Sequence, residues 1–116
     1  MNKLSREQSM QAIPIPATIA EEEPLDGGGA KLSVMVATRP MQRKILRLPE
    51  RVKREYELDV FGREVFGLCD GKNTVADILK QFCKKNKLPP QEGETAVLTF
   101  IRTLVAKGLI VVTLKD

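Results

Sequence analysis

The two cysteines are the residues best suited to nucleophilic or metal chemistry in this sequence. Cys69 and Cys83 are separated by 13 residues, a spacing that matches neither a zinc finger nor a redox motif. The sequence contains no histidine, which removes the commonest metal ligand and the usual base that activates a cysteine or serine. We therefore expect both cysteines to be small buried hydrophobic residues in a reducing compartment, with no metal and no cofactor.

The carboxylates and glycines also have structural explanations. Asp59, Asp70 and Asp77 each stand where a turn or a helix start needs a hydrogen-bond acceptor. The run Gly27-Gly28-Gly29 precedes an expected strand and lacks the Lys-Ser/Thr pair of a phosphate-binding loop. The sequence thus predicts no catalytic residue, and we expect that the chain is not an enzyme.

Length and composition predict one ordinary folded domain. The chain has 116 residues, of which 42% are hydrophobic and 29% charged. No run approaches the roughly 18 apolar residues of a membrane span, and the N-terminus lacks the apolar core of a signal peptide. We expect a cytoplasmic protein with no membrane among its partners.

Charge and chain-breaking residues divide the sequence. Residues 1–30 carry a net charge of −3 and residues 31–116 carry +7. The first part contains Ile13-Pro14-Ile15-Pro16 and the glycine run, which favour an irregular, mobile backbone. We predict a flexible acidic Pro/Gly-rich arm over residues 1–29 and a folded domain over residues 30–116. One hypothesis is that the acidic arm occupies a basic surface of its own domain.

Three strands are expected at the start of the folded domain. Leu32, Val34 and Val36 alternate with smaller or polar residues, which is the strand period. Arg43–Leu48 and Lys53–Leu58 are the second and third strand candidates. In the third, alternate residues share a face, so that one face carries Arg54, Tyr56 and Leu58 and the other Lys53, Glu55 and Glu57. The three would form a small antiparallel sheet.

Three helices and a short closing strand follow. The first helix, which Asp59 can cap, ends at Gly71. The second begins with a capping box at Thr74-x-x-Asp77, and the third runs over Gln91–Lys107. Leu109–Leu114 is the closing strand. This order predicts an α+β, winged-helix-like fold.

Peptide binding suits this layout best. The edge of a small sheet can accept an extended peptide as an extra strand. We expect Leu98, Ile101 and Val105 of the third helix to wall a groove beside the third strand. The basic residues Lys53 and Arg54 would suit an acidic peptide.

Two other function classes remain as alternatives. A winged helix can act as a DNA-binding regulator, but Glu92 and Glu94 at the start of the third helix would repel phosphate, so DNA is an unlikely partner. The same apolar surface could instead make the chain a structural dimerisation module, in which case a homodimer is expected.

The stretch from Arg54 to Ile78 resembles the PqqD-like family, the coenzyme PQQ synthesis protein D group. Its most telling part is Leu68-Cys69-Asp70-Gly71, followed by Thr74-Val75 and Ile78. The segment from Leu104 to Ile110 is similar to the closing L-x-x-x-G-L-I of the family. The resemblance covers roughly residues 45–112.

The resemblance implies a non-catalytic peptide-recognition domain of ribosomal peptide maturation. Such domains hold the leader peptide of a precursor and present it to a maturation enzyme, often a radical S-adenosylmethionine (SAM) enzyme. In the family the leader pairs with the third strand and lies against the third helix. Carried onto this chain, the peptide-binding residues are Lys53, Arg54, Glu55, Tyr56, Glu57, Leu58, Leu98, Ile101, Arg102 and Val105.

Overall fold

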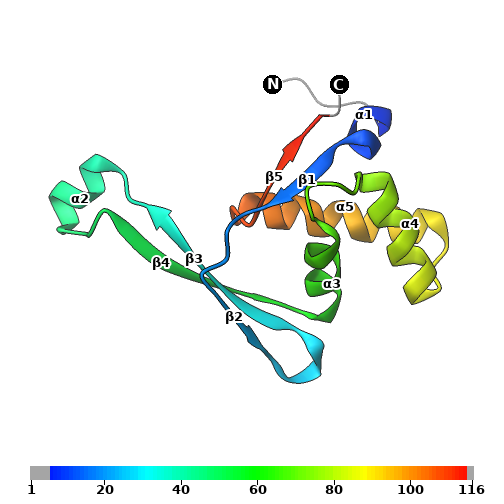
Figure 1. Ribbon diagram of the computed structural model, residues 1–116, viewed down its shortest axis with the longest axis horizontal. Coiled ribbons are helices and arrows are strands. Elements are labelled where there is room, and N and C mark those ends of the chain that lie inside the picture. Colours follow the sequence, from blue (N-terminus) through cyan, green and yellow to red (C-terminus); the bar gives the residue numbers. More distant parts are fainter. Residues whose placement is uncertain (1–5, 115–116) are drawn as a thin grey trace. The chain divides into compact units, whose positions relative to one another are not determined.

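The computed structural model describes residues 6–114 and divides into two compact units (Figure 1). The helical unit combines the chain up to Ala17 with the chain from Phe61 onward, and the hairpin unit is Thr18–Val60. The elements, in chain order, are α1 (Arg6–Gln11), β1 (Ile13–Pro16), β2 (Glu21–Pro24), the 3-10 helix η1 (Asp26–Gly28), β3 (Ala30–Ala37), α2 (Pro40–Leu46), β4 (Arg51–Leu58), α3 (Val60–Leu68), α4 (Val75–Asn86), α5 (Pro90–Ala106) and β5 (Ile110–Thr113). No helix among the described residues is long and apolar enough to cross a membrane.

The core of the helical unit is built around α4 and α5. Phe82 of α4 is buried, and its ring lies edge-on to Phe61 at 6.3 Å and tilted to Phe100 at 6.4 Å. The predicted capping box starts α4: Asp77 N–H donates to the Thr74 hydroxyl, and Thr74 N–H donates to the Asp77 carboxylate. This prediction is confirmed.

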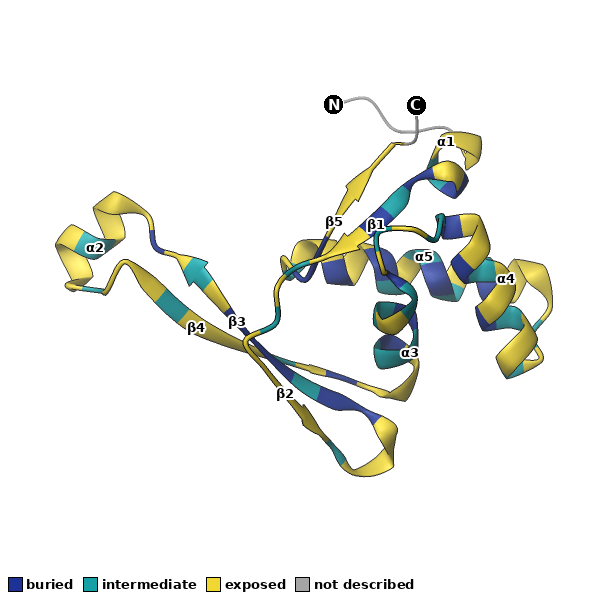
Figure 2. Ribbon diagram, viewed as in Figure 1, coloured by how far each residue is buried: buried dark blue, intermediate teal, exposed yellow. Residues whose placement is uncertain are grey.

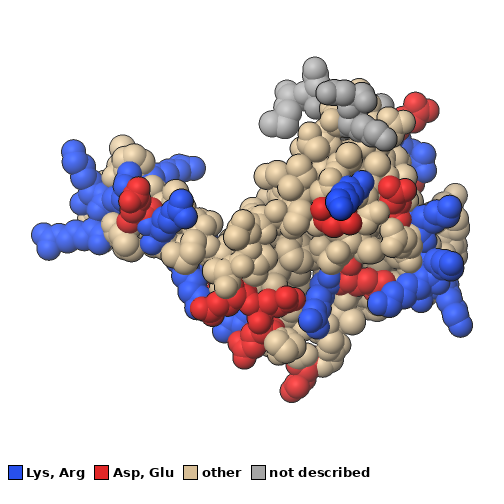
Figure 3. All heavy atoms as spheres, viewed as in Figure 1, with Lys and Arg blue, Asp and Glu red and all other residues tan. Residues whose placement is uncertain are grey.

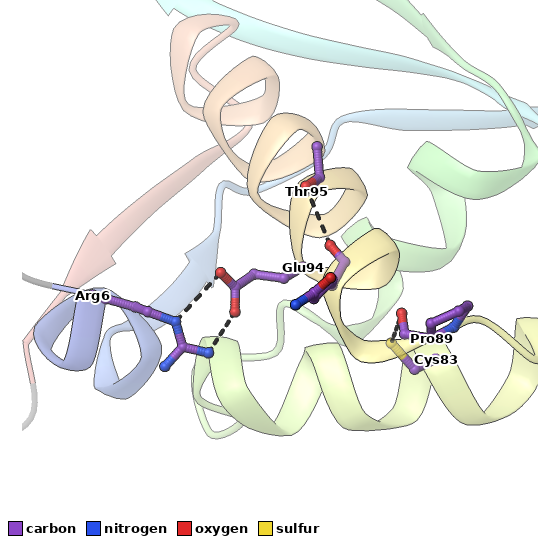
Figure 4. Close-up of polar contacts among 6 residues, drawn as sticks. Arg6, Cys83, Pro89, Glu94 and Thr95 are labelled. Atoms are coloured by element: carbon purple, nitrogen blue, oxygen red, sulfur yellow. Dashed lines mark hydrogen bonds and ion pairs between the residues drawn. The ribbon is translucent and has the colours of Figure 1, made fainter.

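The start of α5 is fixed by close packing and by one ion pair. At Gly93 an added Cβ would collide with Cys83 Sγ, so only glycine lets α5 approach α4 this closely. Arg6 of α1 donates to the Glu94 carboxylate at 2.6 Å, and the Cys83 thiol lies 3.9 Å from the Pro89 carbonyl (Figure 4). In the first turns, the Thr95 hydroxyl donates to the Gln91 carbonyl at 3.2 Å.

A two-stranded antiparallel sheet joins the beginning and end of the helical unit. β1 pairs with β5 in the register Ile13↔Thr113 and Ile15↔Val111. Ala17 N–H extends the ladder to the Leu109 carbonyl at 2.8 Å. The closing strand predicted at Leu109–Leu114 is present as β5, and its partner is β1.

The hairpin unit is a three-stranded antiparallel sheet in the order β2-β3-β4. β3 lies in the middle, pairing Glu21↔Ser33 on one side and Ser33↔Glu55 on the other. Leu32 and Val34 of β3 are buried and Val36 is half-buried, but Ser33, which the alternation places on the opposite face, is buried as well. The α+β, winged-helix-like class with a three-stranded antiparallel sheet and several helices is confirmed.

The strand predicted at Arg43–Leu48 is wrong, because residues Pro40–Leu46 form helix α2. Pro40 stands in the first turn, where its fixed φ and missing N–H suit a helix start, and Arg43 and Lys44 favour the last turn. Arg47 adopts the left-handed conformation at φ 53° and ends the helix. The third strand of the sheet is instead β2, which the sequence did not predict.

The structure also gives regular elements to much of the segment expected to be a flexible arm. Within residues 6–28 it contains α1, β1, β2 and η1. Both proline-containing strands are short edge strands, positions where a missing N–H is tolerated. The two units meet along the chain at residues 17/18 and 60/61.

Candidate functional site

β4 carries the first half of the predicted site and is an edge strand. In the described chain it pairs only with β3. Thr38 N–H donates to the Glu50 carbonyl at 3.0 Å, which fixes the phase of the ladder. Because antiparallel pairing alternates, the peptide groups of Val52 and Arg54 face β3, whereas those of Lys53, Glu55 and Glu57 face away from it.

The two faces of β4 differ in exposure. Tyr56 is half-buried and Leu58 buried on one face, while Lys53, Glu55 and Glu57 of the other are exposed (Figure 2). Arg54 shares the face of Tyr56 but is itself exposed. The outward edge of β4 therefore runs beside one charged face and one partly apolar face.

A network of ion pairs covers the charged face. Lys31 lies 2.8 Å from the Glu55 carboxylate, and its hydrogen bond lowers the pKa of Glu55. Lys53 lies 3.4 Å from Glu21 of β2 and 3.6 Å from Glu55. The charge of Lys53, which we expected to attract an acidic peptide, is thus shared with two carboxylates of the chain itself.

Glu21 bears on the hypothesis that the acidic arm covers its own domain. Glu21, Glu22 and Glu23 lie in β2, which pairs with β3 on the side opposite to β4. Glu21 reaches Lys53 across the face of the sheet. The acidic residues therefore neutralise part of the basic surface and leave the outward edge of β4 uncovered.

The second half of the predicted site lies on α5. Leu98, Ile101, Arg102 and Val105 line one groove of about 370 Å³ within the helical unit. Ile101 is buried at its base, whereas Val105 is 45% exposed. Arg102 is exposed and has no ion pair within residues 6–114, so the groove is apolar with one available cation at its wall.

The other walls of the groove were not predicted. They come from α1 and the residue after it, the start of α4, the end of α5 and β5, and consist of Ser9, Ala12, Val75, Ala106 and Val112. Apart from Ala106, which is part of α5, these residues reach the groove through tertiary packing, which no local sequence signal identifies. The two halves of the predicted site belong to different units.

The groups considered for catalysis are used structurally. Cys69 is buried, its thiol lies 3.2 Å from the Val65 carbonyl, and burial raises its pKa to about 12. Asp70 accepts the N–H groups of Asn73 and Lys72 at 2.8 and 2.9 Å, which lowers its pKa. Both cysteines are free, and residues 6–114 contain no cluster of potential metal ligands.

The family model described as coenzyme PQQ synthesis protein D (PqqD) matches residues 45–110, more than half of the chain. The chain belongs to the PqqD family. Comparisons with curated proteins and with solved structures gave no match. The matched range contains both β4 and α5, the elements of the predicted site.

Proposed function

We propose that this PqqD-family protein is a non-catalytic peptide-binding partner in the maturation of a ribosomally synthesised peptide. It holds the leader segment of the precursor as an added strand on β4 and presents it to a modification enzyme, such as a radical SAM enzyme. Membership of a family described by coenzyme PQQ synthesis supports the pathway class. A titration with candidate peptides identifies which peptide it binds.

The outward edge of β4 carries this proposal. The strand is eight residues long and contains no proline, so each outward residue offers both an N–H and a carbonyl. An extended peptide pairing with Lys53, Glu55 and Glu57 would form a ladder without displacing β3. Main-chain pairing of this kind gives affinity that depends little on the peptide sequence.

The α5 groove supplies what main-chain pairing lacks, which is discrimination between peptides. Its apolar walls accept apolar side chains, and Arg102 accepts a carboxylate. We therefore expect the bound peptide to combine apolar residues with at least one acidic residue. The sequence predicted the apolar part of this groove from Leu98, Ile101 and Val105, whereas the preference for an acidic peptide was assigned to Lys53 and Arg54.

Strand addition is tested by removing one outward N–H. The probe is an NMR titration of the labelled full chain with peptides encoded beside its gene. We expect Glu55→Pro to weaken binding by about tenfold or more, because one ladder hydrogen bond is lost and the ring obstructs the edge. Glu55→Ala is the matched control, since it removes the same carboxylate but keeps the N–H. Equal affinities for the two variants would exclude strand addition at β4.

The groove is tested separately by placing a charge inside it. Leu98→Asp should abolish peptide binding in a folded protein, because it buries a carboxylate among apolar walls. Thr99→Asp, at an exposed neighbouring position on α5, adds the same charge outside the groove and should bind normally. Unchanged affinity of the Leu98→Asp variant in calorimetry would remove the groove from the site. Binding of a DNA duplex that weakens steeply with salt would instead support the regulator alternative.

A further inference from the structure

Helix α2 exposes its large apolar side chains. Met41 and Ile45 are each 71% exposed, and Leu46 is 63% exposed. Met41 and Ile45 lie one turn apart and share one side of the helix, and Leu46 is the next residue along the chain. Arg43 and Lys44 lie between them in the sequence and line one shallow pocket together with Met41. Apolar and basic side chains are therefore interleaved on α2, and none of them is buried.

Basic residues surround this helix. We use the name α2 tip for residues 39–51, which cover α2 and the turns that join it to β3 and β4. The tip carries one acidic residue, Glu50, and five basic residues, Arg39, Arg43, Lys44, Arg47 and Arg51. None of the five forms an ion pair with another residue of the described chain. Figure 3 shows Lys and Arg side chains gathered around this end of the hairpin unit.

We propose that the α2 tip binds the surface of an anionic lipid bilayer. Met41, Ile45 and Leu46 enter the boundary between headgroups and acyl chains, and the surrounding arginines contact lipid phosphates and carboxylates. A cluster of four or more basic residues beside exposed apolar side chains is the pattern that binds phosphatidylserine-type surfaces. Four of the five bases are arginine, whose planar guanidinium pairs with phosphate through two hydrogen bonds.

The size of the tip favours a lipid surface over a protein surface. A helix of seven residues is about 10 Å long, whereas a stable protein interface uses roughly 20–30 residues on each side. Insertion into a bilayer needs no complementary shape, since each apolar side chain and each cation contributes by itself. Nucleic acid would use the basic residues but would leave the three apolar side chains in water.

This inference is independent of the peptide site. The PqqD match begins at residue 45, so Arg39, Arg43 and Lys44 precede it. Surface binding needs no spanning helix. It departs from our expectation of no membrane partner, which considered spanning segments alone.

Vesicle co-sedimentation of the full chain tests the proposal. The probe is a vesicle of phosphatidylcholine with about 30% phosphatidylserine, compared with phosphatidylcholine alone. We expect the protein to bind the anionic vesicles and this binding to weaken as salt is added. Binding to the neutral vesicles should be weaker by about tenfold or more. No sedimentation with anionic vesicles would overturn the proposal.

Two pairs of variants locate the contact. Arg43→Glu with Lys44→Glu should weaken vesicle binding by more than about tenfold. Lys80→Glu with Lys84→Glu makes the same change in net charge on exposed residues of α4 and should bind like the unmodified chain. Ile45→Ser should weaken binding several-fold, whereas Val111→Ser, which removes an exposed apolar side chain from β5, should not.

Three results would contradict this assignment. Equal losses in the two charge-reversed variants would mean that net charge alone drives binding. Full binding by Ile45→Ser would exclude insertion of the apolar side chains. Binding of a DNA duplex, lost in the Arg43→Glu/Lys44→Glu variant and unaccompanied by vesicle binding, would make the tip a nucleic-acid surface. Circular dichroism of each variant shows that the fold is retained.

Discussion

β1 and β4 are both edge strands, but their outward edges differ in chemistry. In β1 the outward positions are Pro14 and Pro16, which have no N–H, and the Pro14 carbonyl already accepts Gly71 N–H at 3.0 Å. In β4 the outward positions are occupied by residues that keep their N–H groups. One edge is closed to an added strand and the other is open, which directs strand addition to the hairpin unit.

The side chains show the same contrast. The helical unit buries Phe82, Ile78 and Leu104, and each is at most 2% exposed. The hairpin unit leaves Met41 and Ile45 largely in water. A large apolar side chain thus stabilises the fold in one place and is available to a partner in the other.

The largest expected effect sharpens this contrast between apolar side chains. Phe82→Ala should lower the free energy of unfolding by about 3–5 kcal/mol, since it leaves a cavity between Phe61 and Phe100. Ile45→Ala should change it by less than about 0.5 kcal/mol, because the side chain is exposed. Urea denaturation followed by circular dichroism measures both. Similar losses in the two variants would mean that α2 packs against the fold.

The next effect tests the two edges with the same substitution. Ile15→Pro removes an N–H that faces β5 and should cost about 1–3 kcal/mol in unfolding free energy. Glu55→Pro removes an N–H that faces away from β3 and should leave the urea midpoint close to that of the unmodified chain. A large loss of stability in Glu55→Pro would show that the edge of β4 is covered.

A smaller effect is the pH dependence of stability that comes from the buried thiol of Cys69. Burial raises the pKa of Cys69 to about 12, above the ordinary value of 9.0, so the unfolded chain loses this proton first as pH rises. The protonated thiol therefore contributes fully to the stability of the folded state below the pKa that Cys69 has in the unfolded chain. Between about pH 9 and pH 12 this contribution is progressively lost. Cys69→Ala should show a shallower fall in stability over this range, and identical pH profiles would contradict the assignment.

The smallest effect lies on the open, charged face of the hairpin unit. Lys31 lowers the pKa of Glu55, so the ionised carboxylate favours the folded state above the unfolded pKa. This contribution disappears as pH falls through the lowered pKa. Thermal unfolding of Glu55→Gln should therefore depend slightly less on pH in the acid range than that of the unmodified chain. An unaltered acid dependence would mean that the ion pair contributes nothing in solution.

Local signals in the sequence were sufficient for some elements of this fold. The capping box at Thr74 and Asp77 and the strand over Lys53–Leu58 depend on neighbouring residues, and both are present. α2 was missed because apolar and polar residues alternate weakly over Arg43–Leu48, as they do in a strand. Pro40 marks the end of a strand as readily as the start of a helix, so it did not distinguish the two. β1 and β2 were missed because prolines and glutamates disfavour strands unless a distant partner supplies the ladder.

The candidate site, like the fold, was predictable only where it depends on residues that are close in the sequence. Helical periodicity placed Leu98, Arg102 and Val105 toward one side of α5, and the structure brings these three residues and Ile101 to one groove. It could not identify Ser9 and Val112 as opposite walls, because these residues are more than 80 positions from each other in the chain. The peptide-binding role of the α5 residues remains a prediction, which the titrations above test.

The pairing of β1 with β5 has a consequence for the order of folding. Ile13 pairs with Thr113, so formation of this ladder closes almost the whole described chain into a loop. Contacts of such long sequence separation carry a large closure entropy and form late, whereas α4 and α5 pack over a short separation. During synthesis the Ile-Pro-Ile-Pro strand emerges early and has no partner until β5 leaves the ribosome. Its prolines would then protect an orphan strand from pairing with the wrong chain.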